Sequence, residues 1–134
     1  MAVRECASEF NECLALADYF RLRGIRFSHL AQETPSGSYQ YGKWQPNMRQ
    51  LQKNKAVGVN KGVPDYIAVI ERPNPSNIQA KTSKLLFIEM KREKLGKVSV
   101  EQAEWINALN KVPGVVAVVC RGFDAAKQVI DALC

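Results

Sequence analysis

The chain has 134 residues, of which 46% are hydrophobic and 24% charged, so it is long enough to bury a core as one ordinary globular domain. Its formal net charge of +6 favours an anionic partner such as nucleic acid. No apolar run approaches the ~18 residues of a membrane span, the N-terminus lacks a signal-peptide core, and none of the four cysteines forms a CxxC pair. We therefore expect a cytoplasmic protein with free thiols, no structural zinc and no membrane association.

The first predicted element is a helix over residues 3–23, because apolar side chains follow a helical stripe and Gly24 provides a stop. The stripe consists of Val3, Cys6, Phe10, Cys13, Leu14 and Ala17. The run IRFSHL at 25–30 then predicts a short strand.

Residues 32–63 are polar and rich in Gly, Pro, Gln and Asn, which predicts a loop with a short helix at 47–56. No acidic residue occurs from Thr34 to Val63, and aromatic residues are interleaved with basic ones, a mixture that suits a phosphate backbone and stackable bases. The candidate nucleic-acid-binding residues are Lys43, Trp44, Arg49, Lys53, Lys55 and Lys61, with Tyr39 and Tyr41 beside them. An ordinary solvated loop is the equal alternative.

The stretch GSYQYGK at 37–43 matches the first seven positions of a phosphate-binding P-loop. The eighth position is Trp44, where a P-loop needs Ser or Thr to bind magnesium, and no apolar strand precedes the stretch. We therefore predict no nucleotide cofactor.

The second half alternates apolar runs with helical patterns. The expected elements are a strand at 65–70, a hairpin loop at 71–84, a strand at 85–91, a helix at 97–111, a strand at 114–120 and a helix at 123–134. The strands at 85–91 and 114–120 are continuously apolar, which predicts burial, and Ser99 with Gln102 has capping-box spacing. The order predicts an α/β fold, a single domain over residues 1–134 with one sheet flanked by helices and a basic polar loop at 32–63.

Charged side chains stand at the ends of two apolar strands. Glu89 and Lys91 share one face because strand side chains alternate, and a hairpin would bring Asp65 alongside them. A buried carboxylate is unfavourable unless it is paired or binds a metal. Carboxylate and carbonyl oxygens suit Mg²⁺ or Mn²⁺, and a metal with a nearby lysine is what phosphodiester hydrolysis needs.

Three motifs carry a resemblance to a known family: GVPD at 62–65, IEMKR at 88–92 and the helix opening at 99–102. They resemble the PD-(D/E)xK nuclease superfamily and, within it, the virus-type replication-repair nuclease group, VRR-NUC. The resemblance covers nearly the whole chain. It implies a restriction-endonuclease-like core with a central mixed sheet in αβββαβ order.

The resemblance also implies site residues. Asp65, Glu89 and the main-chain carbonyl of Met90 would hold Mg²⁺ or Mn²⁺, and Lys91 would be catalytic. Gln102 would belong to the same site, although its spacing from Ser99 also fits the third position of a capping box.

The family further implies a metal-site glutamate on the first helix. Glu5, Glu9 and Glu12 are candidates, and Glu9 lies closest to the apolar stripe at ~100° per residue. We therefore favour Glu9 for the catalytic site, with Glu12 second and Glu5 third.

Standalone members of the group are similar to Holliday-junction resolvases, which implies a homodimeric endonuclease acting on branched DNA, from a phage or prophage. Arg92 and Lys94 would then contact phosphates, with solvated surface as the equal alternative. Two other functions remain open: a non-catalytic DNA-binding module of the same fold, and a nuclease acting on RNA or on DNA ends.

Overall fold

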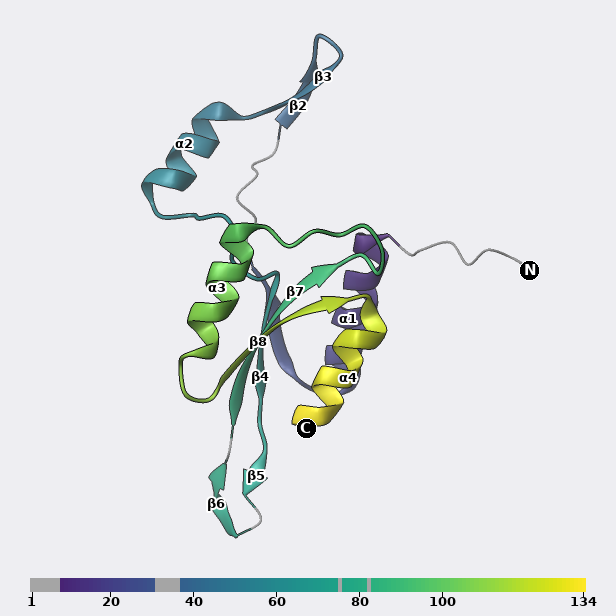
Figure 1. Ribbon diagram of the computed structural model, residues 1–134, viewed down its shortest axis with the longest axis vertical. Coiled ribbons are helices and arrows are strands. Elements are labelled where there is room, and N and C mark those ends of the chain that lie inside the picture. Colours follow the sequence, from purple (N-terminus) through teal and green to yellow (C-terminus); the bar gives the residue numbers. More distant parts are fainter. Residues whose placement is uncertain (1–7, 31–36, 75, 82) are drawn as a thin grey trace, which may run out of the picture.

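The computed structural model describes residues 8–30, 37–74, 76–81 and 83–134. The helices of this part of the chain are α1 (Glu9–Leu22), α2 (Met48–Ala56), α3 (Val100–Asn110) and α4 (Phe123–Leu133). The strands are β1 (Arg26–His29), β2 (Gly37–Gln40), β3 (Lys43–Pro46), β4 (Tyr66–Ile70), β5 (Pro73–Asn74), β6 (Asn77–Lys81), β7 (Lys84–Lys91) and β8 (Val115–Arg121). Figure 1 shows α1, α3 and α4 beside one central sheet, with α2 and the two hairpins β2–β3 and β5–β6 extending beyond it.

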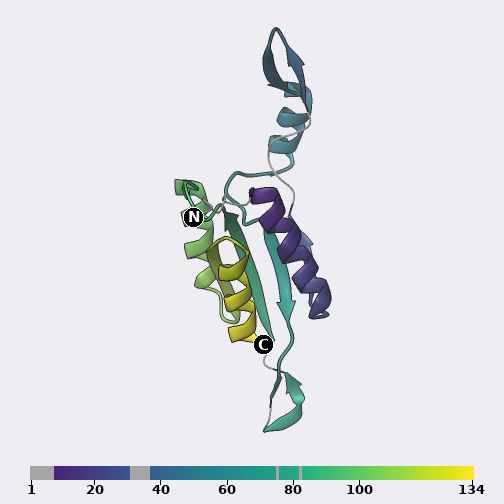
Figure 2. The ribbon, with the colours of Figure 1, turned by 90° about the vertical axis from the view of Figure 1, so that its right-hand side faces the viewer.

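The central sheet has the strand order β1-β4-β7-β8. Its first three strands pair antiparallel, while β7 and β8 are parallel and joined by a crossover through α3, so the sheet is mixed. The predicted α/β fold with a mixed sheet flanked by helices is therefore confirmed. Viewed from the side, the strands lie between α1 and α3 (Figure 2).

The core lies where α1 and α4 pack on one face of β4 and β7. Leu86, Ile88 and Met90 are fully buried there, together with Phe20 of α1 and Ile130 of α4. Alternation then directs the odd-numbered side chains of β7, including Glu89 and Lys91, to the opposite face, which α3 adjoins. The hydrophobic pattern of the strand therefore decides that its charged end faces α3.

The first helix is offset from the predicted apolar stripe. Leu16 and Phe20 are its buried residues, whereas Phe10 and Leu14 are largely exposed. Spacing alone predicts that a helix has an apolar stripe, but which of two apolar faces is buried depends on where the sheet lies. Val3 and Cys6 lie outside the described residues.

The expected polar loops contain strands. β2 and β3 pair as a hairpin within the segment predicted as a loop, and the short helix expected at 47–56 is confirmed as α2. A second hairpin, β5–β6, forms within the predicted loop at 71–84. These strands lack the apolar alternation of a half-buried strand, which is why the sequence pattern missed them. We refer to residues 37–60, which contain β2, β3 and α2, as the arm.

The arm and the β5–β6 hairpin extend from opposite ends of the domain (Figures 1 and 2). The arm lies at the end where β4 begins and β7 stops. In the described part of the arm, no side chain of α2 is buried.

Strand β8 is less buried than its apolar sequence predicts. Only Ala117 and Cys120 are buried along it, because β8 is an edge strand and α3 covers it incompletely. The Asn110 side chain exchanges two hydrogen bonds of 2.8 and 2.9 Å with the backbone of Ala117, which occupies part of this open edge. In the described ranges no helix is both long and apolar enough to cross a membrane.

Candidate active site

The GVPD motif places a carboxylate at the start of β4. The register pairs Tyr66 of β4 with Ile88 of β7, so Asp65 and Glu89 stand at the next position along the two strands. The Asp65 carboxylate accepts a hydrogen bond of 2.8 Å from the backbone amide of Met90 and is only 7% exposed. This bond fixes the Asp65 side chain against the end of β7.

Glu89 is the second buried carboxylate of this end of the sheet, with 3% exposure. Its Oε1 lies 3.4 Å from Lys91 Nζ and accepts a hydrogen bond of 2.8 Å from Gln102 Nε2. Its Oε2 is buried and has no hydrogen-bond partner among the described residues. An unsatisfied buried carboxylate oxygen is costly, so this atom marks a position where a positively charged ligand would be favourable.

The electrostatics of Glu89 agree with its geometry. Burial and the neighbouring Asp65 charge raise the pKa of Glu89 from 4.5 to about 7, against the opposing effect of Lys91. The carboxylate of Glu9 on α1 is near enough to add to the rise. Negative charges from two strands and a helix therefore converge here, with Lys91 as a cationic neighbour.

Gln102 belongs to two hydrogen-bond sets at once. Its Oε1 accepts a hydrogen bond from the Ser99 backbone amide at 2.9 Å, and its own backbone N–H donates to Ser99 Oγ at 3.2 Å, so the predicted capping box is present. Its Nε2 donates to Glu89. The two sequence readings of Gln102, helix cap and site residue, are therefore compatible in one side chain.

Gly62 brings the GVPD motif against the start of α3. Its φ of +87° is a backbone conformation that glycine adopts readily. A Cβ at this position would lie 2.5 Å from the backbone carbon of Glu101, too close for any other residue. Gly62 thus allows the segment before Asp65 to lie directly against the first turn of α3, which carries Gln102. The sequence pattern did not reveal this close approach.

The glutamates of the first helix have different surroundings. Glu9 is exposed but close enough to the site to influence the pKa of Glu89. The Glu12 carboxylate accepts a hydrogen bond from the backbone amide of Phe123 and so caps the N-terminus of α4. Glu5 lies outside the described residues.

The candidate nucleic-acid-binding residues fall into two groups. Those at 43–61 lie on the arm or on the segment that leads from it to Gly62. Arg92 and Lys94 are exposed on the turn that follows β7. Both groups occur at the end of the sheet that carries Asp65 and Glu89 (Figure 1).

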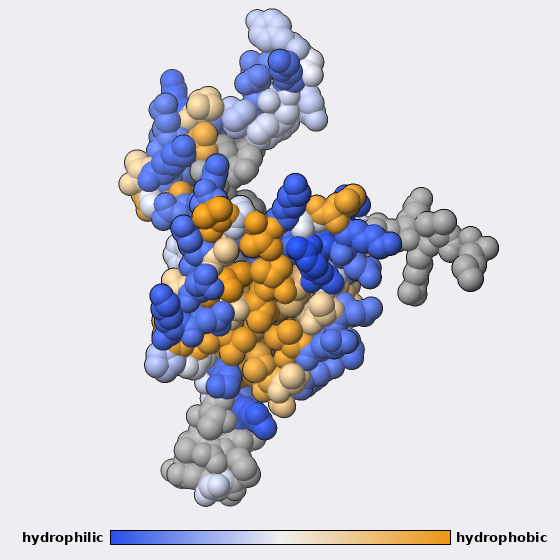
Figure 3. Space-filling view, viewed as in Figure 1, coloured by the Kyte–Doolittle hydropathy of each residue, from blue (hydrophilic) through white to orange (hydrophobic). Residues whose placement is uncertain are grey.

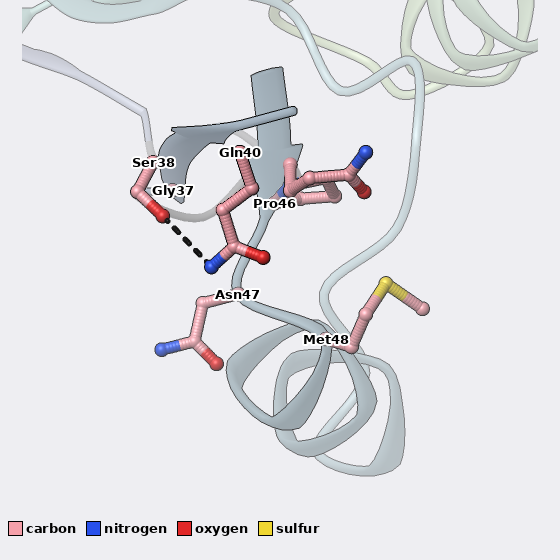
Figure 4. A pocket seen from close by; sticks show the side chains of 7 residues that line it. Gly37, Ser38, Gln40, Pro46, Asn47 and Met48 are labelled. Atoms are coloured by element: carbon pink, nitrogen blue, oxygen red, sulfur yellow. Dashed lines mark hydrogen bonds between the residues drawn. The ribbon is translucent and has the colours of Figure 1, made fainter. Parts of the chain in front are cut away.

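The arm contains a hollow of about 510 Å³ between its hairpin and α2 (Figure 4). It is lined by Gly37, Ser38, Gln40, Gln45, Pro46, Asn47 and Met48. The lining has amides and a hydroxyl but no ionisable group, so it suits hydrogen bonding and does not offer acid–base chemistry.

The carboxylates of this site bear on whether it could hold a divalent metal. Within the described ranges, no three His, Cys, Asp or Glu side chains gather as a ligand set. Asp65 and Glu89 nevertheless supply two carboxylates, one with an unsatisfied oxygen. Because Mg²⁺ is usually held by one or two carboxylates and keeps several waters, these residues fit such an ion.

Comparison with known proteins gives a consistent result. Residues 18–124 match the family described as VRR-NUC domain. A solved structure of a "VRR_NUC domain protein" superposes with a TM-score of 0.66, at 21% sequence identity, over 96% of this chain and 89% of that chain. No curated protein matches the chain. The family match covers most of the chain, and the fold comparison agrees with it. This chain therefore belongs to the VRR-NUC nuclease family.

Proposed function

We propose that this protein is a metal-dependent endonuclease that hydrolyses phosphodiester bonds in DNA. The observation that carries the proposal is the buried Oε2 of Glu89, which lacks a hydrogen-bond partner in the described structure and stands beside Asp65 and Lys91. A bound cation would satisfy that oxygen and offset the repulsion between the two carboxylates.

Each residue of the site has a defined part in this proposal. Asp65, Glu89 and the Met90 carbonyl would hold Mg²⁺ or Mn²⁺, which when bound polarises a phosphoryl oxygen and lowers the pKa of a coordinated water. Lys91 orients the attacking water or stabilises negative charge that develops on the phosphate. Gln102 holds Glu89 through a hydrogen bond to Oε1, so Oε2 would remain available to the metal ion. Glu9 adds negative charge beside the two strands.

The substrate is proposed to be branched DNA, with two copies of the chain acting together. The net charge of +6, and the basic residues on the arm and on the turn after β7, support binding to an anionic polymer. A symmetric dimer would place two sites on two strands of a junction. Figure 3 shows an apolar area between α3 and α4. The half-buried Val116, Val118 and Val129 pack at the adjoining edge of the core.

The dimer is tested by its mass in solution. Light scattering should give twice the 15.0 kDa chain mass, and Val129→Glu should shift the population toward the monomer. A wild-type mass of 15.0 kDa at the assay concentration would refute the dimer without affecting the chemistry of the site.

The nuclease activity is tested with labelled four-way junction, splayed-arm, linear duplex and single-stranded DNA. Each substrate is incubated with Mg²⁺, with Mn²⁺ or with EDTA, using wild type and Lys91→Ala in parallel. Cleavage that needs both metal and Lys91, and is fastest on the junction, supports the proposal. Binding without cleavage in either metal would favour a non-catalytic DNA-binding module instead. Cleavage of RNA alone, or of DNA ends alone, would mean that branched DNA is not the substrate.

A further inference from the structure

The β2–β3 hairpin at the end of the arm has two chemically different faces. Tyr39 and Trp44 are Cα partners across the two strands, so their rings lie on the same face. Gln40 and Lys43 form the next pair, and alternation places them on the other face, where Gln40 borders the polar hollow. One face is therefore aromatic and the other is polar.

The Trp44 ring packs against the backbone of Gly37 on the aromatic face. It passes so close to Gly37 that a Cβ there would lie 2.8 Å from Trp44 Cζ2. The ring nevertheless remains 41% exposed, and its cross-strand partner Tyr39 is 78% exposed. These two side chains thus form an exposed aromatic surface, in which the Trp44 ring packs over Gly37.

Tyr41 occupies the tip of the hairpin with a fully exposed side chain. Tyr41 and Gly42 both have positive φ, 53° and 73°, as in a two-residue type I′ turn. Asn, Asp or Gly is strongly preferred at the first of these positions, because a larger residue is strained there. The exposed ring therefore does not stabilise the turn, and the backbone would prefer a different residue.

The charge of the segment indicates what these rings contact. No acidic residue occurs from Thr34 to Val63, and basic residues follow the hairpin along α2 and its exit. A surface of exposed rings and positive charge matches the bases and phosphates of nucleic acid. A protein ring can stack on a base only where no neighbouring base already covers the face of that base. The arm lies at the same end of the domain as Asp65 and Glu89 (Figure 1).

We infer that the β2–β3 hairpin is a stacking element, on which Tyr41, Tyr39 and Trp44 receive unpaired bases of the nucleic acid while α2 contacts its backbone. This inference deepens the proposed nuclease function by assigning a substrate class, namely nucleic acid with unpaired bases near the cleavage site. Its test is a binding measurement, which does not depend on cleavage.

The experiment uses the full chain carrying Trp105→Phe, which leaves Trp44 as the single tryptophan. EDTA is present throughout to prevent cleavage. Oligo-dT of about twelve nucleotides, within the length that one small stacking module covers, is titrated while Trp44 fluorescence is recorded. A blunt duplex of similar length is the comparison ligand. Stacking predicts that oligo-dT quenches Trp44 and that the blunt duplex quenches it much less.

The variant Tyr41→Asn is the decisive one, because Asn-Gly suits the type I′ turn and so keeps the hairpin folded while removing the ring. We expect it to weaken oligo-dT binding about tenfold with an unchanged salt dependence. Tyr41→Phe, which keeps the ring, should bind like the parent.

Unchanged oligo-dT affinity in Tyr41→Asn, or equal quenching by the blunt duplex, would overturn the inference. Failure of the two proposals can be distinguished. Normal stacking without metal-dependent cleavage of any substrate would refute the nuclease function alone. Normal cleavage with an unaffected Tyr41→Asn variant would refute the stacking element alone.

Discussion

The two ends of the β4–β7 pair differ sharply. At one end lie Asp65 and Glu89, with Lys91 two residues further along β7, and all three side chains are mostly shielded from solvent. At the other end, Ile70 is buried opposite the exposed Lys84. The far end follows the usual rule of buried apolar and exposed charged side chains, while the site end departs from it.

The extensions at the two ends differ as well. The arm at the site end has no acidic residue and carries three exposed aromatic rings. The segment that contains the β5–β6 hairpin, residues 71–84, includes Glu71 and has no aromatic residue. Buried carboxylates, exposed aromatic rings and a basic segment without acidic residues therefore occur together at one end of the sheet. The following predictions test whether function is concentrated there too.

The largest expected effect is the loss of cleavage when Lys91, at the site end of β7, is replaced. Lys84, at the other end of the same strand, is the control. Lys91→Ala should lower the cleavage rate by at least about a hundredfold, because in the proposed mechanism it removes the cation that stabilises the reacting phosphate. Lys84→Ala, at the exposed far end of the same strand, should cleave like wild type. The measurement is single-turnover cleavage with Mg²⁺. A wild-type rate in Lys91→Ala would mean that the site lies elsewhere.

The buried carboxylate of Glu89 should destabilise the metal-free protein. Its pKa is about 7 in the folded state against an ordinary 4.5, so the folded state binds the proton more tightly than the unfolded state does. Stability is therefore greatest below pH 4.5 with respect to this group and is lost as the pH rises through 7. Glu89→Gln should recover up to about 3 kcal/mol in EDTA near pH 8.

Thermal unfolding in EDTA at several pH values measures this effect, with Glu104→Gln on the exposed surface of α3 as the matched control. Added Mg²⁺ should stabilise wild type above pH 7 and should not stabilise Glu89→Gln. If the melting temperatures of wild type and Glu89→Gln changed equally with pH, the ionised Glu89 carboxylate would not destabilise the folded protein.

Substituting Gly62 and Gly58, which both have positive φ, distinguishes the cost of backbone strain from the cost of a collision with α3. Gly62→Ala combines strain with a collision against Glu101, whereas Gly58, with φ of +94°, has open space where a Cβ would be. Gly58→Ala should cost about 1 kcal/mol. Gly62→Ala should cost about 1–2 kcal/mol more and slow cleavage, because α3 carries Gln102 away from Glu89.

Urea unfolding and cleavage rates measured on both variants decide the point. If both variants lost the same stability and kept the same rate, Gly62 would have no positioning role.

The basic residues of α2 should contribute to binding more than basic residues at the far end. Neutralising Lys53 and Lys55 together should weaken DNA binding about tenfold and reduce the slope of log K against log salt by roughly one to two. The matched control neutralises Lys84 and Lys111, which are exposed at the other end of β7 and α3. Fluorescence anisotropy in EDTA at several salt concentrations measures both. Equal losses in the two double variants would attribute binding to net charge alone.

The smallest expected effect distinguishes the two glutamates of α1. Glu9→Gln should reduce metal-dependent cleavage by more than Glu12→Gln does, because Glu9 contributes charge to the site. Glu12→Gln should instead lower the melting temperature, since its carboxylate caps α4, an interaction of about 0.5–1 kcal/mol. The opposite ranking in the cleavage assay would assign Glu12 to the site.

The sequence by itself determined a good deal of this protein. Apolar runs, capping residues and the Gly24 stop predicted the core helices and strands, because the tendency to be buried and the preferred backbone conformation depend on residue type. The alternation in LLFIEMK predicted Glu89 and Lys91 on one face, and the expected hairpin predicted Asp65 beside them, which agrees with the observed pairing of β4 with β7.

Only the tertiary structure decided the rest. The face of α1 that is buried, the edge position of β8 and the approach of Gly62 to α3 depend on where distant elements lie, and no local pattern encodes those distances. The β2–β3 hairpin escaped prediction because its strands bury nothing and so lack hydrophobic alternation. The unsatisfied oxygen of Glu89 is likewise a tertiary property: the sequence supplies a carboxylate, and the surrounding fold removes its water.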